Sequence, residues 1–251
     1  MRIITILTDF GSFYPAQMKG VILSRLKDKE VIFVDIAHDI PPQNIQVGAF
    51  VLLSSVKHFP IGTIHLSVVD PGVGTERWGI IVESGGQLFV GPNNGLLIPA
   101  AKSLGEPKAF KINHQFEASS TFHGRDVFAP IVAMLAEGQR PQDFGSRVKP
   151  LDLGFGKPTR TKDGIEVTIL YVDRFGNLIL NLSRLPSYDV SLKGIKLKRV
   201  KTYAEGRRIE PLITIGSQGF AEIAVNQGSA ADAFCCKAGD RVKLEEIECL
   251  E

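Results

Sequence analysis

The chain has 251 residues, a length that suits one large domain or two modest ones. Its 44% hydrophobic and 22% charged residues are ordinary for a folded protein and exclude a disordered chain. The formal net charge of +2 gives no reason to expect nucleic acid or an anionic membrane as a partner.

The first third of the chain alternates between strand and helix patterns. Ile3–Leu7 and Val31–Ile36 are apolar runs typical of strands buried on both faces, and Thr63–Val69 predicts a third strand. Pro15–Leu26 and Ile45–Val56 carry apolar residues at helical spacing. This alternation predicts a parallel sheet covered by helices.

Each of the three strands ends near a carboxylate: Asp9, Asp39 and Asp70. In open parallel sheets, ligands bind outside the carboxyl ends of the strands. We therefore look for a site at this edge first. Further along, Ile80–Glu83 and Leu88–Gly91 predict a hairpin, and the region between Phe128 and Glu137 predicts a helix.

The pattern changes after a Gly/Pro-rich linker at Gly154–Pro158. Short alternating strands follow, at Glu166–Val172, Leu178–Leu182, Ile195–Val200, Ala221–Val225 and Arg241–Glu245. We predict two domains: an α/β domain over 1–153, with a central mostly parallel sheet flanked by helices, and a smaller all-β barrel over 159–251. A basic run in the second domain alternates with apolar residues and is typical of the solvent-facing side of a strand: Lys193, Lys196, Lys198, Arg199 and Lys201.

The sequence around Met1–Phe10 is too short for a secretory signal, and no apolar stretch reaches the roughly 18 residues that a membrane span requires. The cysteines Cys235, Cys236 and Cys249 fit neither a disulfide framework nor zinc-finger spacing. We expect a cytoplasmic protein with no membrane partner.

Two polar groups in the first domain are candidates for chemistry. Asp70-Pro71-Gly72-Val73-Gly74 follows a strand, with Arg77 shortly after it, and His123 precedes a helix. Asp, Arg and His together can hold and polarise a water molecule. Taken separately, the first group is typical of a tight turn and the second of a helix cap.

Two groups in the second domain are equally open to a structural reading. Asp173-Arg174-Phe175-Gly176-Asn177 is typical of a hairpin loop with glycine at its bend. The small residues after Asn226 suit a cramped turn, and they would also let a flat base approach the backbone.

The combination of motifs is more specific than any one of them. Seven occur in order: Thr8-Asp9-Phe10-Gly11, Met18-Lys19-Gly20, Asp70-Pro71-Gly72-Val73-Gly74, Gly91-Pro92-Asn93-Asn94-Gly95, His123-Gly124-Arg125-Asp126, Phe175-Gly176-Asn177 and Asn226-Gln227-Gly228-Ser229-Ala230-Ala231. Together they resemble the S-adenosylmethionine (SAM) hydroxide adenosyltransferase family, relatives of the fluorinase and chlorinase enzymes. The resemblance spans nearly the whole chain.

The resemblance implies a role for ten residues. Asp70, Arg77 and His123 match the set that positions and activates water. The substrate contacts that it implies are Asp9 for the ribose, Asp173 for the methionine amino group, Asn177 and Asn226 around adenine, Phe122 and Phe175 as apolar walls, and Ser217 as a further contact. It also implies a homotrimer with each active site between the α/β domain of one subunit and the barrel of the next.

The implied reaction is hydrolysis of SAM to adenosine and L-methionine by attack of water at C5′. Methionine leaves as a neutral molecule, so no general acid, metal or cofactor is needed. Either His123 or Asp70 can take the proton. His38, His58, His65 and His114 do not cluster with acids at metal-ligand spacing, and we interpret them as structural or surface residues.

Two alternatives stay open. The first is a non-catalytic SAM- or adenosine-binding protein, which would have no use for a water-activating set. The second is a SAM-dependent halogenase, disfavoured because Asp70 would repel a halide and because Val73 and Gly124 replace hydroxyl-bearing residues. One segment departs from the family: the loop Ser12–Gln17 is short and lacks the expected acidic residue.

Overall fold

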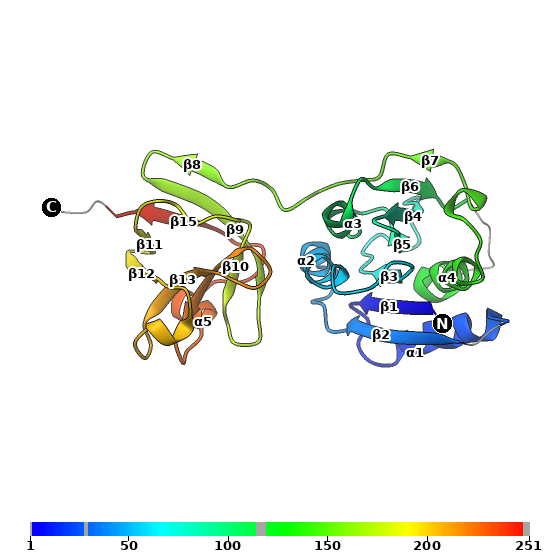
Figure 1. Ribbon diagram of the computed structural model, residues 1–251, viewed down its shortest axis with the longest axis horizontal. Coiled ribbons are helices and arrows are strands. Elements are labelled where there is room, and N and C mark those ends of the chain that lie inside the picture. Colours follow the sequence, from blue (N-terminus) through cyan, green and yellow to red (C-terminus); the bar gives the residue numbers. More distant parts are fainter. Residues whose placement is uncertain (1, 28–29, 114–118, 248–251) are drawn as a thin grey trace. The chain divides into compact units, whose positions relative to one another are not determined.

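The computed structural model describes residues 2–27, 30–113 and 119–247, so His114 and Cys249 lie outside the described residues. The chain forms two compact units, Met1–Gly154 and Phe155–Glu251, each built around its own sheet (Figure 1). The two-domain architecture expected from the sequence is confirmed.

The first unit has a seven-stranded sheet in the order β2-β1-β3-β5-β4-β6-β7. Its strands are β1 (Arg2–Thr8), β2 (Val31–Ala37), β3 (Ile64–Val68), β4 (Gly79–Ser84), β5 (Gln87–Pro92), β6 (Lys108–Lys111) and β7 (Arg147–Val148). The expected hairpin is present, because β4 and β5 pair in register from Gly79↔Pro92 to Ser84↔Gln87.

The prediction of a mostly parallel sheet is wrong. The strands are parallel from β2 through β1 and β3 to β5, but antiparallel from β5 through β4 and β6 to β7. A turn as tight as the one between β4 and β5 joins only antiparallel strands. The segment Val31–Ile36 is also not buried on both faces, because β2 is an edge strand and its residues are partly exposed.

In the described part of this unit, the α-helices that cover the sheet are α1 (Tyr14–Arg25), α2 (Ile45–Val56), α3 (Ile98–Leu104) and α4 (Ala129–Ala136). Helix α1 packs with α4, and α2 with α3 (Figure 1). Successive side chains of β1 point to opposite faces of the sheet. Ile4 and Ile6 belong to the core under α1 and α4, and Leu7 approaches Gly48 of α2 on the other face.

The parallel half of the sheet determines where the polar strand ends gather. Thr8, at the end of β1, pairs with Val68 at the end of β3. Asp9 and Asp70, which follow these strands, therefore emerge at the same edge of the sheet.

The second unit is a closed barrel, as expected. Strand β10 pairs with both β14 and β9, and this pairing closes seven strands into a ring. Strand β8 pairs with β9 and is not part of the ring. Its pairings are antiparallel apart from the parallel pair β12 and β13. The elements are β8 (Thr159–Thr161), β9 (Gly164–Val172), β10 (Leu178–Leu180), β11 (Val190–Leu192), β12 (Ile195–Arg199), β13 (Pro211–Ile215), β14 (Ala221–Val225), α5 (Ala230–Phe234) and β15 (Arg241–Glu246).

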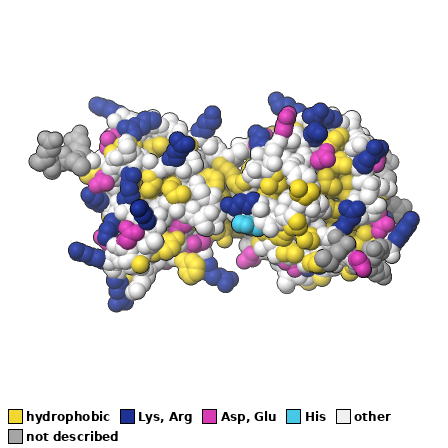
Figure 2. Space-filling view, in the orientation of Figure 1, with side chains coloured by type: hydrophobic (Ala, Val, Ile, Leu, Met, Phe, Trp, Pro, Cys, Tyr) yellow, Lys and Arg dark blue, Asp and Glu magenta, His cyan; other side chains and the backbone are white. Residues whose placement is uncertain are grey.

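Figure 2 shows Lys, Arg, Asp and Glu side chains interspersed over the face in view. On this face the two signs are mixed, so it carries no large field of one charge of the kind that nucleic-acid binding uses. None of the helices in the described part of the chain has the length and hydrophobicity that a membrane-spanning segment requires.

His65 is fully buried in the sheet and belongs to a polar network there. Its Nδ1 lies 2.7 Å from the Thr5 hydroxyl, and its Nε2 lies 2.7 Å from Oε1 of Gln87. The ring stacks on Phe89 at 4.9 Å between centroids. Burial lowers the pKa of His65 from 6.5 to about 4, so the ring is neutral at pH 7.

Replacing His65 with Gln should therefore reduce the acid sensitivity of folding. Between the ordinary pKa and about 4, the unfolded chain binds a proton here that the folded chain does not. The free energy of unfolding falls by about 3 kcal/mol through this group as the pH drops across that window. Urea unfolding at pH 7 and pH 4.5 should show a smaller loss in His65→Gln. An equal loss in both proteins would mean that His65 does not contribute to the acid sensitivity.

Gly91 at the end of β5 belongs to the Gly91–Gly95 motif, and its role is steric. A Cβ there would lie 2.2 Å from the backbone oxygen of Ser67. Gly91→Ala should thus destabilise the protein by about 3 kcal/mol. Gly20→Ala is the matched control, because a Cβ on this helical glycine meets nothing within 4 Å. It should be neutral or stabilise α1 by about 0.5–1 kcal/mol. Equal unfolding midpoints for the two variants would contradict the steric role.

Candidate active site

The turn after β3 brings Arg77 back to Asp70. The backbone N–H of Val73 donates to the Asp70 carbonyl at 3.3 Å, and that of Thr75 donates to the Gly72 carbonyl at 3.2 Å. Glycine is required at Gly74, where φ is +78° and a Cβ would lie 2.6 Å from the Ser120 carbonyl oxygen. This turn reverses the chain within a few residues.

Asp70 and Arg77 form a bidentate ion pair. Nε of Arg77 donates to Oδ1 of Asp70 at 2.9 Å, and Nη2 of Arg77 donates to Oδ2. The Asp70 side chain is only 4% exposed and that of Arg77 13%. The guanidinium also lies 5.3 Å from the centre of the Phe128 ring, in a cation–π contact. A pair held in this way has one geometry and little net charge.

His123 lies beside this ion pair and completes a cluster of three side chains. It immediately precedes a π-helical turn (Gly124–Phe128) that leads into α4, and its Nδ1 lies 2.9 Å from Nη2 of Arg77. A guanidinium only donates hydrogen bonds, so Nδ1 accepts and the proton of the neutral ring is on Nε2. The N–H at Nε2 is then the group that the ring can offer to a ligand.

The surroundings of His123 favour its neutral form. Burial lowers the pKa of His123, and the positive charge of Arg77 lowers it further, against the opposing effect of Asp70 and Asp126. Asp126 itself is held by Arg125, at 2.6 Å between Nε and Oδ1, which lowers the pKa of that carboxyl. The cluster is therefore set up with a neutral imidazole beside a paired carboxylate at pH 7.

An aromatic wall adjoins the cluster. Phe122 packs edge-on against Phe10 at 5.6 Å and Tyr14 at 5.2 Å between ring centroids. A Cβ on Gly124 would lie 3.2 Å from the Phe122 ring and 3.3 Å from that of Phe10. These aromatic rings border a pocket of about 410 Å³, lined by Phe10, Tyr14, Ser119, Thr121, Phe122 and Arg125.

Asp9 lies in the same turn as Phe10, at the end of β1. Its Oδ2 accepts a hydrogen bond from the backbone N–H of Gln43 at 2.8 Å, which fixes the carboxylate. Tyr14 was missed by the sequence analysis, which treated the Ser12–Gln17 segment only as a departure from the family. The available signal was the adjacent aromatic residues Phe13 and Tyr14, whose ring centroids lie 3.9 Å apart in the structure.

The second unit holds the remaining candidates. Oδ1 of Asp173 accepts hydrogen bonds from the backbone N–H groups of Phe175 at 2.9 Å and Asn177 at 2.8 Å, and Oδ2 accepts one from Nδ2 of Asn177 at 2.9 Å. Asp173 thus organises its own loop. Phe175 is 76% exposed at the tip of that loop.

A pocket of about 620 Å³ brings the candidates of this unit together. Its lining residues are Asp173, Phe175, Asn177, Tyr203, Ser217, Gln218, Glu222, Ala224, Val225, Asn226, Gln227 and Gly228. Nδ2 of Asn226 donates to the Gly206 carbonyl at 2.8 Å. Ser217 is exposed at the pocket. The sequence analysis missed Tyr203 and Glu222.

Of the histidines interpreted from the sequence as structural or surface residues, those that the structure describes are not part of this cluster. His38 bridges the Thr8 hydroxyl at 2.9 Å and the Asp35 carboxylate at 3.0 Å, whereas His58 is exposed. Among the described residues, no three His, Cys, Asp or Glu side chains are grouped so that they could hold a metal ion.

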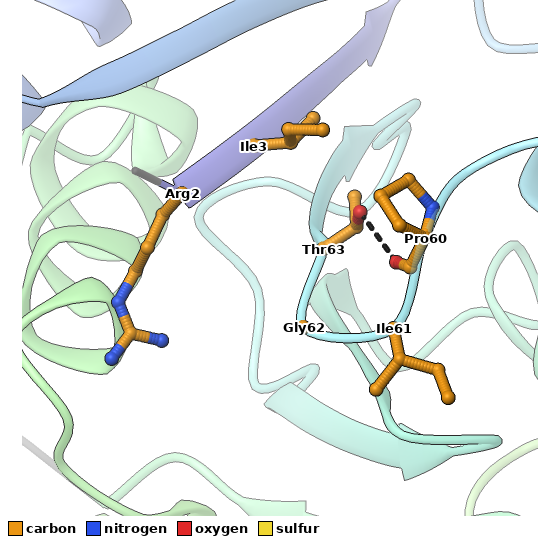
Figure 3. Close-up of a pocket in the computed structure, with 6 residues that line it drawn as sticks. All are labelled: Arg2, Ile3, Pro60, Ile61, Gly62 and Thr63. Atoms are coloured by element: carbon orange, nitrogen blue, oxygen red, sulfur yellow. Dashed lines mark hydrogen bonds between the residues drawn. The ribbon is translucent and has the colours of Figure 1, made fainter.

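A further pocket, of about 340 Å³, lies at the opposite end of the strands (Figure 3). It is lined by Arg2 and Ile3, where β1 begins, and by Pro60–Thr63, just before β3 begins. Thr63 turns its hydroxyl to the Pro60 carbonyl at 2.8 Å, and Arg2 is the one ionisable residue in this lining. None of its described lining residues is an acid–base group for chemistry near neutral pH, in contrast to the carboxyl edge of the sheet.

Two family models match the chain. The SAM hydroxide adenosyltransferase N-terminal domain matches residues 4–145, and the SAM hydroxide adenosyltransferase C-terminal domain matches residues 167–243. The chain belongs to the SAM hydroxide adenosyltransferase family. The resemblance seen in the seven motifs is confirmed.

Full-length relatives agree with this assignment. An (R)-S-adenosyl-L-methionine hydrolase from Thermus thermophilus is 37% identical, over 97% of this chain and 100% of that protein. The crystal structure of an uncharacterized conserved protein from Thermotoga maritima has a TM-score of 0.85 at 33% identity, over 96% of this chain and 99% of that one. A fluorinase from Actinopolyspora mzabensis is more distant, at 24% identity over 96% of each.

The role of Arg77 in setting the charge of His123 can be tested directly. Arg77→Met should raise the pKa of His123, because the variant loses a positive charge that lowers it and releases the Asp70 carboxylate that raises it. NMR titration of the His123 ring protons in the parent and the variant measures this shift. Arg140→Met is the control, since Arg140 pairs with Asp143 at the surface. An unchanged or lower pKa in Arg77→Met would contradict the proposed charge arrangement.

Proposed function

We propose that this protein hydrolyses SAM to adenosine and L-methionine. The observation that carries the proposal is the Asp70–Arg77–His123 cluster, found at the carboxyl edge of the sheet in a member of the SAM hydroxide adenosyltransferase family. The relative from Thermus thermophilus is named for the same reaction on the (R) sulfonium epimer. We propose the (R) epimer as the preferred substrate here.

The reaction needs a well-placed water more than it needs a strong acid. The water oxygen forms a bond to C5′, and the C5′–S bond breaks with its electron pair moving to sulfur. The sulfonium becomes the neutral thioether of methionine, and one water proton is released. Because this leaving group requires no proton and no electrophile, the reaction as proposed uses no cofactor.

The hydrogen bonds of the cluster suggest which role each of the three residues has in the reaction. The lone pair of Nδ1 of His123 is committed to Arg77, so the ring is a poor base in this arrangement. Its Nε2–H is suited to hold the water oxygen. Asp70 keeps lone pairs on both oxygens beyond those used by Arg77, so we assign the proton to this carboxylate. Arg77 positions both groups and stabilises hydroxide character in the water.

A halide is a less suitable nucleophile at the same position, although the pairing with Arg77 moderates the repulsion expected from Asp70 alone. A halide brings a full negative charge to an ion pair that is already neutral, and burial makes removal of the halide from water costly. Water, in contrast, gains a proton acceptor. The fluorinase is also less similar to this chain in sequence than the SAM hydrolase is, which likewise favours water as the nucleophile.

The substrate-binding residues form the second part of the proposal. We assign Asp9 to the ribose, Phe122 to an apolar wall, and the pocket of the second unit, with Asn177 and Asn226, to adenine. Phe175 and Ser217 are proposed contacts at the same pocket. We further propose a cytoplasmic homotrimer, in which the catalytic cluster of one subunit and the barrel pocket of another act on one SAM molecule.

Asp70→Asn tests the chemistry. The variant keeps the size of the side chain but cannot take a proton, so kcat should fall by about 100-fold or more. Purified protein is incubated with each sulfonium epimer in ¹⁸O-labelled water. The nucleosides are separated by chromatography and their masses are measured by mass spectrometry. The parent should give adenosine that carries the label at O5′.

The control is Asp143→Asn, which alters a surface Asp–Arg pair in the same unit and should leave activity unchanged. Three results would contradict the proposal: bound but intact SAM, a chlorinated nucleoside in chloride buffer, or full activity in Asp70→Asn. The first would favour a binding protein, and the second a halogenase.

A further inference from the structure

A row of polar side chains adjoins the turn that carries Asp9, and the proposed mechanism gives this row no role. Nζ of Lys19 on α1 lies 2.6 Å from Oδ2 of Asp35 on β2. Oδ1 of Asp35 lies 3.0 Å from Nε2 of His38, and Nδ1 of the same ring lies 2.9 Å from the Thr8 hydroxyl. Thr8 is the last residue of β1 and is fully buried. The row therefore runs from α1, across β2, to the residue directly before Asp9.

A shift in the strand register brings His38 to its place in this row. Asp35 of β2 pairs with Ile6 of β1, but Ala37 pairs with the very next residue of β1, so β2 carries one extra residue between them. In an unbroken register, Thr8 would face Ala37. The extra residue instead brings His38 beside Thr8, which is the contact of 2.9 Å. Irregularities of this kind redirect side chains and are frequent next to active sites.

The hydrogen bonds along the row have one consistent direction. Although burial raises the pKa of Asp35, the contacts with Lys19 and His38 hold that pKa below its ordinary value, so the carboxylate is ionised at pH 7. An ionised carboxylate only accepts hydrogen bonds, so the neutral ring carries its proton on Nε2. Nδ1 then accepts from the Thr8 hydroxyl, whose oxygen in turn accepts the backbone N–H of Phe10 at 3.4 Å. Thr8 thus connects the imidazole to the backbone of the turn.

The loop that follows β2 holds the same turn through its backbone. The N–H of Gly11 donates to the His38 carbonyl at 2.9 Å. The N–H of Gln43 donates to Oδ2 of Asp9 at 2.8 Å, and Gln43 has a φ of +65°, which residues other than glycine rarely adopt. A change of the His38 side chain leaves both backbone bonds in place. It removes only the hold on Thr8, so the contribution of the ring can be measured by itself.

We propose that His38 is a positioning residue for substrate binding, which acts through the Thr8 hydroxyl on the turn that carries Asp9. This inference rests on the proposed function, in which Asp9 binds the ribose. The carboxylate and the lysine beyond the ring orient it, which gives the Met18-Lys19-Gly20 motif a role. The ribose is bound before and during the reaction, so a displaced Asp9 weakens binding more than it slows the chemical step.

Thr8→Val and His38→Leu test the two ends of this contact, because each keeps the approximate volume of the side chain and removes one partner. The KM for SAM should rise about 3- to 10-fold in each, the loss expected for one hydrogen bond, with kcat changed much less. Thr8→Ser keeps the hydroxyl and should keep the parent KM. The double variant should match the more affected single variant, since both changes break the same bond.

The chain offers a matched control for each position. Thr63→Val removes another buried threonine hydroxyl, which bonds to the Pro60 carbonyl at the opposite end of the strands. This variant should lose stability as Thr8→Val does, but keep the parent KM. His58→Leu replaces an exposed histidine of the same unit and should change neither. Unfolding midpoints show whether each variant folds, and His38→Leu carries the test if Thr8→Val does not fold.

A substrate analogue identifies the group on which the row acts. The 2′,3′-dideoxy analogue of SAM lacks the two ribose hydroxyls that Asp9 is proposed to bind. The ratio of KM between His38→Leu and the parent should be about 3 to 10 with SAM and fall to about 1 with the analogue. An equal rise with both substrates would mean a general structural effect and would overturn the inference. Additive effects in the double variant, or the parent KM in both single variants, would overturn it as well.

Failure of this inference is separable from failure of the proposed function. If the parent protein turns over neither epimer, hydrolysis is wrong, and calorimetric titration of SAM and the dideoxy analogue still tests His38 through the dissociation constant. If the parent is active and His38→Leu matches it in both KM and affinity, hydrolysis stands and the positioning role of His38 is wrong.

Discussion

The ion pair between Asp70 and Arg77 is the constraint on which the catalytic half of this structure depends. Both side chains are nearly buried, so loss of either would leave an unpaired charge at a cost of several kcal/mol. The pair closes the turn after β3 and fixes the guanidinium against Phe128. The same guanidinium then determines which nitrogen of His123 is protonated. One interaction thus sets the geometry, the net charge and the tautomer of the cluster.

The two halves of the first sheet make different contributions to this pair. The parallel half brings the ends of β1 and β3 to one edge, which is why Asp9 and Asp70 emerge together. The antiparallel half supports the turn, because β4 begins just after Arg77. A Cβ on Gly79, its first residue, would lie 2.7 Å from the Phe128 ring. Glycine at that position lets the ring reach the sheet and support the guanidinium.

Much of this arrangement was predictable from the sequence. Buried strands and amphipathic helices have strong periodicity, so β1, β3, α2 and the β4–β5 hairpin matched closely. The mixed character of the sheet was not predictable, because strands β6 and β7 are short and show little hydrophobic periodicity. Glu222 was missed for a different reason: a single acidic residue in an apolar strand has no motif. Its two-residue spacing from Ala224 and Asn226 was the available signal.

The two carboxylates that line the pocket of the second unit, Asp173 and Glu222, are held in different ways. Asp173 comes just before Phe175–Gly176–Asn177, yet its oxygens are satisfied by the backbone and side chain of that loop. Glu222 comes from a neighbouring strand and keeps an oxygen free because a single hydroxyl holds it. Oδ2 of Asp173 accepts a single hydrogen bond, so this carboxylate can hold its loop and still offer a lone pair to a ligand.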